Sequence, residues 1–155
     1  MESSKKILFI LLLFICVLTQ PTYLGLTSYH TKGEPREAIV AVSMLQTDNW
    51  ILPVNNGGDL AYKPPFFHWC IALCSLPIGH VNEFTSRLPS AIALIVMTMA
   101  TFLFFAKRTR KDLAFLASLL LFSCIEIHRA GANCRVDMVM TCSVSYTHLR
   151  AHETR

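Results

Sequence analysis

Residues 88–106 (LPSAIALIVMTMATFLFFA) constrain this chain most, because the run holds no ionisable side chain. A helix needs about 20 mostly apolar residues to cross a hydrocarbon core of about 30 Å. Two further runs qualify: residues 7–26 hold Tyr23 as an ionisable group, and the shorter run at 113–128 holds Glu126 near its end. No polar stripe recurs at the helical period, which excludes a soluble helix with one wet face. The sequence therefore predicts an all-α integral membrane protein with about three transmembrane helices.

The charge distribution predicts the topology. A formal charge of +4 with 53% apolar and 15% charged residues excludes a disordered chain and an acidic tail. A nucleic-acid-binding face needs clustered basic residues, whereas Lys5 and Lys6 precede the first run and KRTRK at 107–111 separates the second from the third. Lys and Arg favour the cytoplasmic ends of membrane helices. We therefore expect no nucleic-acid partner, an internal amino terminus, an external segment at 27–87, and an external position from His128 onward.

The first apolar run has a second interpretation as a cleaved signal peptide. Lys5 and Lys6 followed by residues 7–18 resemble the charged and apolar regions of such a peptide. No A-x-A-like cleavage site follows, because residues 19–22 (TQPT) lead into further apolar residues. We interpret the run as a retained membrane anchor, and the signal peptide stays the alternative.

Residues 33–37 (GEPRE) precede AIVAVSML at 38–45, and together they predict the start of an amphipathic helix in the external segment. Pro35 suits the first helical position, and Glu34 lies near the positive end of the helix dipole. Helix capping is therefore one explanation of Glu34, and a functional carboxylate is the other.

A second motif, YKPPFFHW at 62–69, follows a turn-rich loop. The two prolines after Lys63 hold the backbone extended, and the aromatic residues suit a membrane interface. Residues 66–77 are too short to cross a bilayer, so we expect an interfacial or re-entrant helix there. Lys63 either reaches toward lipid headgroups or acts in a site.

Further polar residues lie at the ends of the predicted spans. Arg87 opens the second span, and Arg135 and Asp137 follow the third. The predicted topology places them on the same external side as Glu34 and Lys63. Carboxylates and cations that converge on one membrane face suit an enzyme acting on a lipid phosphate, although scattered interfacial charges give the same pattern.

The cysteines indicate no metal site. The chain has no C-x-x-C pair, and His68 with Cys70 and Cys74 lacks the paired spacing of structural zinc sites. We therefore expect no metal and no cofactor, and we interpret His68 as a packing residue.

Five motifs of this chain resemble the amino-terminal part of the GT-C class of membrane glycosyltransferases. In chain order they are GEPREAIVAVSML, TDNWILP, YKPPFFHW, EFTSRLPSA and RVDM. The similarity is to the bacterial aminoarabinose (lipid A) transferases and the protein O-mannosyltransferase-like family, glycosyltransferase families 39 and 83. It runs from about residue 5 to about residue 142, and the order of the motifs makes it specific. The resemblance implies a larger helical bundle in the bacterial inner membrane with a long first external loop. It also implies transfer of a sugar, with inversion, from a polyprenyl-phosphate carrier to a lipid A-like glycolipid, a protein or another glycan outside the cytoplasm.

The resemblance also implies roles for individual residues. Glu34 and Asp137 fall at positions expected to be catalytic. Cations expected to contact the carrier phosphate are Lys63 of the K-P-P motif, Arg36, Arg87 of the R-L-P motif, and Arg135. Gly33 departs from the family pattern, which often has Asp-Glu where this chain has Gly33 and Glu34. Either Glu34 replaces the first acidic residue, or this subgroup works differently.

The end of the chain departs from the family pattern as well. Residues 143–155 (SVSYTHLRAHETR) are polar and resemble a translated sequencing adapter, so we set them aside as a tail outside the family domain at 1–142. A genuine short external tail is the alternative. The resemblance implies more helices than three, so we expect an inactive fragment of the enzyme. A small membrane-anchored accessory protein is the competing interpretation, and a secreted binding domain is disfavoured by residues 88–106.

Overall fold

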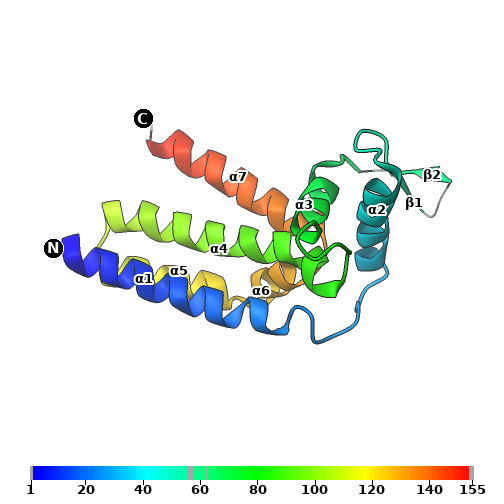
Figure 1. The fold of residues 1–155 in the computed structure, drawn as a ribbon. Coiled ribbons are helices and arrows are strands. Elements are labelled where there is room, and N and C mark those ends of the chain that lie inside the picture. The colour runs from blue at the N-terminus through cyan, green and yellow to red at the C-terminus, as the bar shows by residue number, and fades with distance from the viewer. Residues whose placement is uncertain (1, 56–57, 62, 154–155) are drawn as a thin grey trace.

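A computed structural model describes residues 2–55, 58–61 and 63–153 (Figure 1). The described chain is predominantly helical, which confirms the predicted all-α membrane fold. Its elements are α1 (Glu2–Thr19), the 3-10 helix η1 (Pro21–Tyr23), α2 (Gly33–Thr47), β1 (Val54–Asn55), β2 (Asp59–Leu60), α3 (Phe66–Ser75), α4 (Glu83–Arg108), α5 (Lys111–Ser123), α6 (Ile125–Ala132) and α7 (Val136–Glu153). The two short strands pair antiparallel, with Val54 opposite Leu60.

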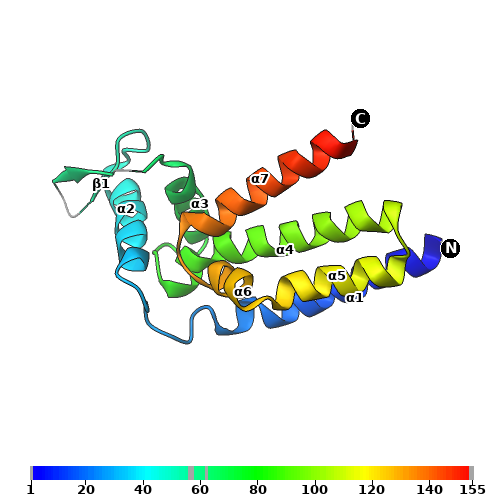
Figure 2. The ribbon, with the colours of Figure 1, turned by 180° about the vertical axis from the view of Figure 1, so that it is seen from behind.

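Two segments of the described chain are long and apolar enough to cross a membrane, Ser4–Tyr23 and Glu83–Arg108. A third crossing is formed if α5 and α6, which meet at an angle of 62°, count as one broken span. α1, α4 and α5 run side by side (Figure 2). Large apolar side chains on α1 remain exposed, which suits a helix that faces lipid: Ile7, Ile10, Leu11, Phe14, Val17 and Leu18.

α4 begins at Glu83, before the apolar run that starts at residue 88. Its first turn is fixed by a capping box, in which the Asn82 side chain accepts from the Thr85 amide at 2.8 Å and Thr85 Oγ1 accepts from the Asn82 amide at 3.0 Å. The polar residues Thr85, Ser86 and Arg87 in the first turns of α4 are also buried. Because these residues are polar, a hydropathy scan does not detect that the helix begins with them.

The main core lies between the long helices and includes Leu12 of α1, Leu94 and Phe102 of α4, and Met138 of α7. α6 packs closely on α4, because a Cβ atom at Gly131 would lie 2.5 Å from Leu94 Cδ2. This close approach places the carboxyl end of α6 against the amino-terminal half of α4.

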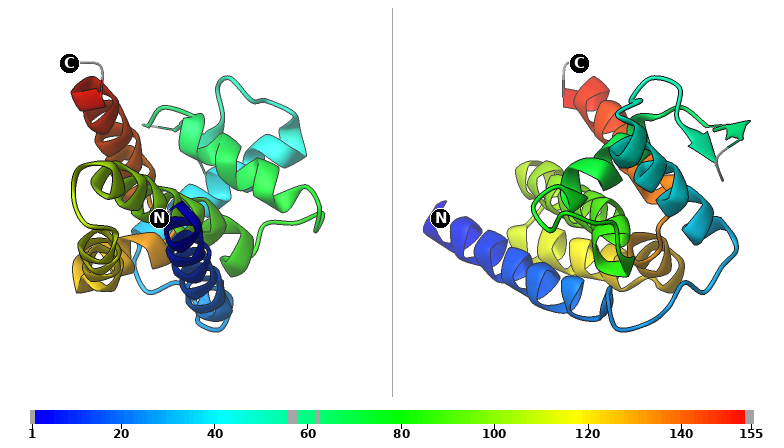
Figure 3. Two further views of the ribbon diagram at one scale, coloured as in Figure 1. Left: turned by 90° about the vertical axis from the view of Figure 1, so that its left-hand side faces the viewer. Right: turned by 45° about the vertical axis from the view of Figure 1, so that its right-hand side comes forward.

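The candidate residues from the segment predicted to be external gather at one end of the bundle. α2, α3 and the β1–β2 hairpin lie at the end opposite the amino terminus, next to the start of α4 and the junction of α6 and α7 (Figures 1 and 3). A small core of Ala41, Phe67, Ile71 and Cys134 joins α2, α3 and this junction. The apolar helix α3 is too short to cross a bilayer.

α7 differs from the sequence expectation. It runs back toward the end that holds the amino terminus, and Arg108 at the end of α4 donates to the backbone oxygen of His152 at 3.1 Å. Met138 of α7 packs into the main core. The expected external position from His128 onward stays a prediction. Residues 143–153, set aside above, continue α7.

Candidate functional site

Glu34 and Arg87 form a buried ion pair between the first turn of α2 and the start of α4. Arg87 Nε donates to Glu34 Oε1 at 3.0 Å, and the two side chains are 2% and 0% exposed. The same Oε1 accepts from the backbone amide of Cys134 at 3.0 Å, and Oε2 accepts from the backbone amide of His30 at 2.9 Å. Glu34 thus joins three segments that are far apart in the sequence.

The Arg87 guanidinium also fixes the segment that follows α1. It donates to the backbone oxygens of Leu24 at 2.7 Å, Thr27 at 2.8 Å and Ser28 at 3.0 Å, and it lies over the Tyr29 ring. Charge-assisted bonds of this kind are the stronger class of protein hydrogen bond. Arg87 therefore anchors the chain between the first span and α2.

The environment of Glu34 stabilises its ionised form. Burial raises the pKa of Glu34, but the hydrogen bonds from Arg87 and from the amides of Cys134 and His30 outweigh burial, so the pKa lies below its ordinary value of 4.5. In this structure Glu34 and Arg87 have structural roles. The predicted catalytic role of Glu34 and the predicted phosphate contact of Arg87 stay predictions.

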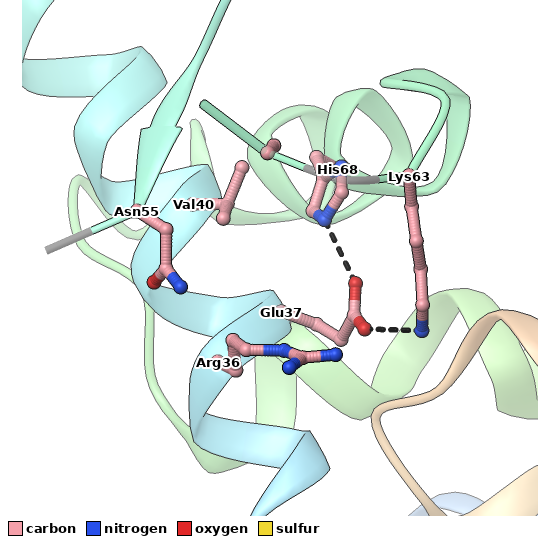
Figure 4. Close-up of a pocket in the computed structure, with 7 residues that line it drawn as sticks. Arg36, Glu37, Val40, Asn55, Lys63 and His68 are labelled. Atoms are coloured by element: carbon pink, nitrogen blue, oxygen red, sulfur yellow. Dashed lines mark hydrogen bonds and ion pairs between the residues drawn. The ribbon is translucent and has the colours of Figure 1, made fainter. Parts of the chain in front are cut away.

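Glu37, one helical turn after Glu34, is the centre of a second polar cluster (Figure 4). Lys63 Nζ donates to Glu37 Oε1 at 2.5 Å, and His68 Nε2 lies 2.8 Å from Glu37 Oε2. Glu37 and His68 are buried, whereas Lys63 is 34% exposed. Burial raises the pKa of Glu37, but the bonds from His68 and Lys63 outweigh burial, so this carboxyl also has a pKa below its ordinary value.

Local sequence explains how the cluster assembles. Pro64 and Pro65 follow Lys63, and Pro65 is the N-cap of α3, so the lysine lies immediately before a helix that packs on α2. His68 then lies in the first turn of α3 and faces Glu37. Sequence reasoning missed Glu37 as a site residue and interpreted His68 as a packing residue rather than a metal ligand. An acid at the i+3 position from Glu34 was the available signal.

A pocket of about 20 Å³, roughly the space of a water molecule, lies beside this cluster. Arg36 is exposed, and its side chain extends beside Glu37 in Figure 4. The pocket therefore combines two cations, Arg36 and Lys63, with one buried carboxylate. Its lining residues are Arg36, Glu37, Val40, Asn55, Ala61, Lys63 and His68.

Arg135 and Asp137 line a larger pocket of about 240 Å³. Arg135 Nε is 3.2 Å from Asp137 Oδ2, and the side chains are 45% and 60% exposed. A Cβ atom at Gly33 would lie 3.9 Å from Arg135 Cζ, so a side chain at position 33 would meet this guanidinium. Asp137 is thus an accessible carboxylate, in contrast to the buried Glu34. The lining residues are Thr31, Glu126, Arg129, Ala130, Asn133, Arg135 and Asp137.

The predicted site residues therefore fall into three groups. Lys63 and Arg36 share the small pocket, Arg135 and Asp137 share the larger one, and the Glu34 and Arg87 pair holds the elements that carry them. The hydrogen bond from the Cys134 amide to Glu34 connects α2 with the segment that bears Arg135 and leads into Asp137 in the first turn of α7.

Comparison with known proteins gives these residues a family context. The sequence profile of the family described as dolichyl-phosphate-mannose-protein mannosyltransferase matches residues 62–154. The chain belongs to this family. The predicted resemblance to the GT-C aminoarabinose transferase-like proteins is confirmed by this match and by the relatives below. Members of this mannosyltransferase family are membrane proteins, in agreement with the apolar helices of the chain.

Two curated proteins and one solved structure are similar to this family member. An undecaprenyl phosphate-alpha-4-amino-4-deoxy-L-arabinose arabinosyl transferase from Shewanella sediminis (strain HAW-EB3) is 26% identical over 139 residues, 88% of the chain and 25% of the relative. An uncharacterized protein from Aquifex aeolicus (strain VF5) is 30% identical over 117 residues, 74% of the chain and 27% of the relative. The crystal structure of ArnT from Cupriavidus metallidurans bound to undecaprenyl phosphate matches with a TM-score of 0.79 at 20% identity, over 88% of the chain and 25% of that protein. The chain thus spans about a quarter of the length of these relatives.

Proposed function

We propose that this chain carries the part of a polyprenyl-phosphate sugar transferase that binds the carrier phosphate. The observation that supports this most is the position of Lys63, whose ammonium group is held by the buried Glu37 at a pocket that Arg36 also lines. Two cations at one pocket suit a phosphate group. The family match adds support, because members are named for transfer from a polyprenyl-type phosphate sugar.

The chemistry follows from the charge that develops during transfer. Breaking the bond between sugar C1 and the carrier phosphate leaves negative charge on the phosphate, and a fixed cation stabilises that charge where it forms. Lys63 supplies this cation in the proposal, with Arg36 beside it. Arg135 is the corresponding cation at the larger pocket.

Asp137 is the proposed general base. It is exposed to the larger pocket, and a general base contributes roughly 100-fold to 10,000-fold to a rate. If the acceptor is itself an ionised phosphate, Asp137 orients it instead. Glu34 then acts as a positioning residue, because its bond to the Cys134 amide supports the turn that leads into α7, whose first turn carries Asp137.

We further propose that the site faces the extracytoplasmic side of a bacterial inner membrane. Lys5, Lys6 and the basic residues at 107–111 belong to the opposite end of the bundle, and such residues favour the cytoplasmic side. The acceptor is then an extracytoplasmic lipid A-like glycolipid, protein or other glycan, and the transfer inverts the anomeric centre.

An activity assay on the full-length gene product tests the proposal. With a polyprenyl-phosphate-linked sugar as donor, Lys63→Met and Asp137→Asn should each lower transfer at least about 100-fold while the protein still inserts into the membrane. Lys32→Met is the matched control, because Lys32 is an exposed lysine at the N-cap of α2. Wild-type rates in both site variants would refute the assignment, and absence of transfer by the wild type would favour an accessory membrane protein.

A further inference from the structure

The carboxylate of Glu37 contacts two basic groups at once, Lys63 and His68. Glu37 lies before the part of the chain that the family profile matches, which begins at residue 62. One carboxylate oxygen accepts from Lys63, and the other lies 2.8 Å from His68 Nε2. Because Glu37 is a buried carboxylate, His68 needs a proton on Nε2 to satisfy it. Among the residues that the structure describes, His68 Nδ1 has no hydrogen-bond partner.

Charge balance in this cluster depends on Lys63. The ammonium group neutralises Glu37, so a second proton on His68 would leave a buried cation with Nδ1–H unpaired. A phosphate is larger than this water-sized pocket, so it would bind at the mouth, where Lys63 is partly exposed, and would compete there with Glu37 for the ammonium group. Once Lys63 turns to the phosphate, Glu37 is left as a buried carboxylate whose other hydrogen-bond partner, among the described residues, is His68.

We propose, resting on the function proposed above, that phosphate binding at Lys63 is coupled to proton uptake by His68. The phosphate takes Lys63 from Glu37, and a proton from solvent moves to His68 Nδ1, which converts the pair of His68 and Glu37 into an ion pair. The arriving phosphate favours the same step, because it brings negative charge and acceptor oxygens to a pocket that His68 lines.

The groups around His68 agree with this direction. Glu37 of α2 and an incoming phosphate favour the imidazolium, whereas Arg36 and Lys63 at the same pocket oppose it. Cys134, before α7, interacts with Glu37; burial raises its pKa to about 12, so it stays neutral. On α4, Arg87 is already paired with Glu34. Movement of Lys63 toward the phosphate is therefore the change that decides the protonation of His68. Glu37 is a positioning residue for both Lys63 and His68.

Calorimetry can count the protons. Undecaprenyl phosphate is titrated into the full-length protein in detergent micelles at pH 7, in buffers with different ionisation enthalpies. We expect the wild type to take up more protons than His68→Gln, by up to about one per site. We also expect the affinity advantage of the wild type over His68→Gln to grow as pH falls from 8 to 6, by at most about tenfold per pH unit. Both proteins bind the same lipid phosphate, so its own ionisation cancels when the wild type is compared with His68→Gln.

Two further variants separate the explanations. Glu37→Gln should also lose the extra proton uptake, and it should bind undecaprenyl phosphate several-fold more tightly than the wild type at pH 8, because Lys63 no longer has a competing carboxylate. His80→Gln, at an exposed histidine outside the pocket, should keep the wild-type proton uptake. Binding with equal proton uptake in the wild type, His68→Gln and Glu37→Gln would overturn this inference alone. Absence of binding by the wild type would overturn the proposed function as well.

Discussion

The carboxylate of Glu34 lies 3.0 Å from the Nε atom of Arg87, although 53 positions separate the two residues in the chain. Both side chains are buried, and each also makes hydrogen bonds to backbone groups of distant segments. The pair therefore organises the end of the bundle opposite the amino terminus, where Lys63 and Asp137 lie.

Arg87→Met should destabilise the protein by about 3–5 kcal/mol, because it leaves Glu34 as a buried carboxylate without its cation. The loss should appear as a lower unfolding temperature in detergent. Arg110→Met is the control, since Arg110 is 81% exposed and its contact with Asp112 at 3.6 Å is a surface pair. Equal unfolding temperatures for the two variants would contradict a structural role for Arg87.

Acid should destabilise the protein through Glu34 and Glu37. Both carboxyls have a pKa below 4.5 in the folded protein, so they contribute stability above the ordinary pKa, and this contribution is lost as pH falls through the folded value. The unfolding temperature should be level between pH 7 and about pH 5 and should decline below that. Glu34→Gln should start lower and decline less steeply, and parallel curves for the two proteins would exclude Glu34 as a source of the acid sensitivity.

Gly131→Ala should destabilise the contact between α6 and α4 by about 1–3 kcal/mol, because the new methyl group would overlap Leu94. Adding Leu94→Ala should recover part of the loss by making space. Gly33→Ala is the matched control, since its new Cβ would meet ordinary contacts at 3.9 Å. Thermal unfolding of the three variants decides the matter, and a neutral Gly131→Ala would mean that α6 packs less closely than described.

Cysteine labelling should place the two ends of the bundle on opposite sides of the membrane. Lys32 and Thr109 are both exposed, next to α2 and at the end of α4. In intact cells with a permeable outer membrane, a membrane-impermeant maleimide should modify Lys32→Cys, and it should modify Thr109→Cys only after the inner membrane is opened. The reverse pattern would place Lys63 in the cytosol and contradict the proposed orientation.

The sequence predicted the features that depend on local composition. The uncharged run at 88–106 correctly indicated a helix long and apolar enough to span a membrane. The position of Lys63 before two prolines correctly indicated the start of a short helix, whose interfacial location stays a prediction. α4 starts earlier than its apolar run because Asn82 and Thr85 cap it, and hydropathy does not register such a cap.

The contacts that assemble the site could not be predicted from one sequence. Glu34 has the pattern of a helix-capping acid, yet its partners Arg87 and the Cys134 amide lie 53 and 100 positions away. Likewise, the pairing of Glu37 with His68 depends on how α3 packs against α2, which periodicity does not specify. The residue types led to the prediction of a site that binds a lipid phosphate. Which carboxylates are buried depends on tertiary packing, which the residue types do not specify.

Photo-crosslinking with a photoreactive undecaprenyl phosphate tests the central claim most directly. The full-length protein should be labelled on the segment around Lys63, and excess undecaprenyl phosphate should compete. Lys63→Met should lose this labelling, whereas Lys32→Met should keep it. Undiminished labelling in Lys63→Met, or labelling confined to segments away from the Lys63 pocket, would contradict the account.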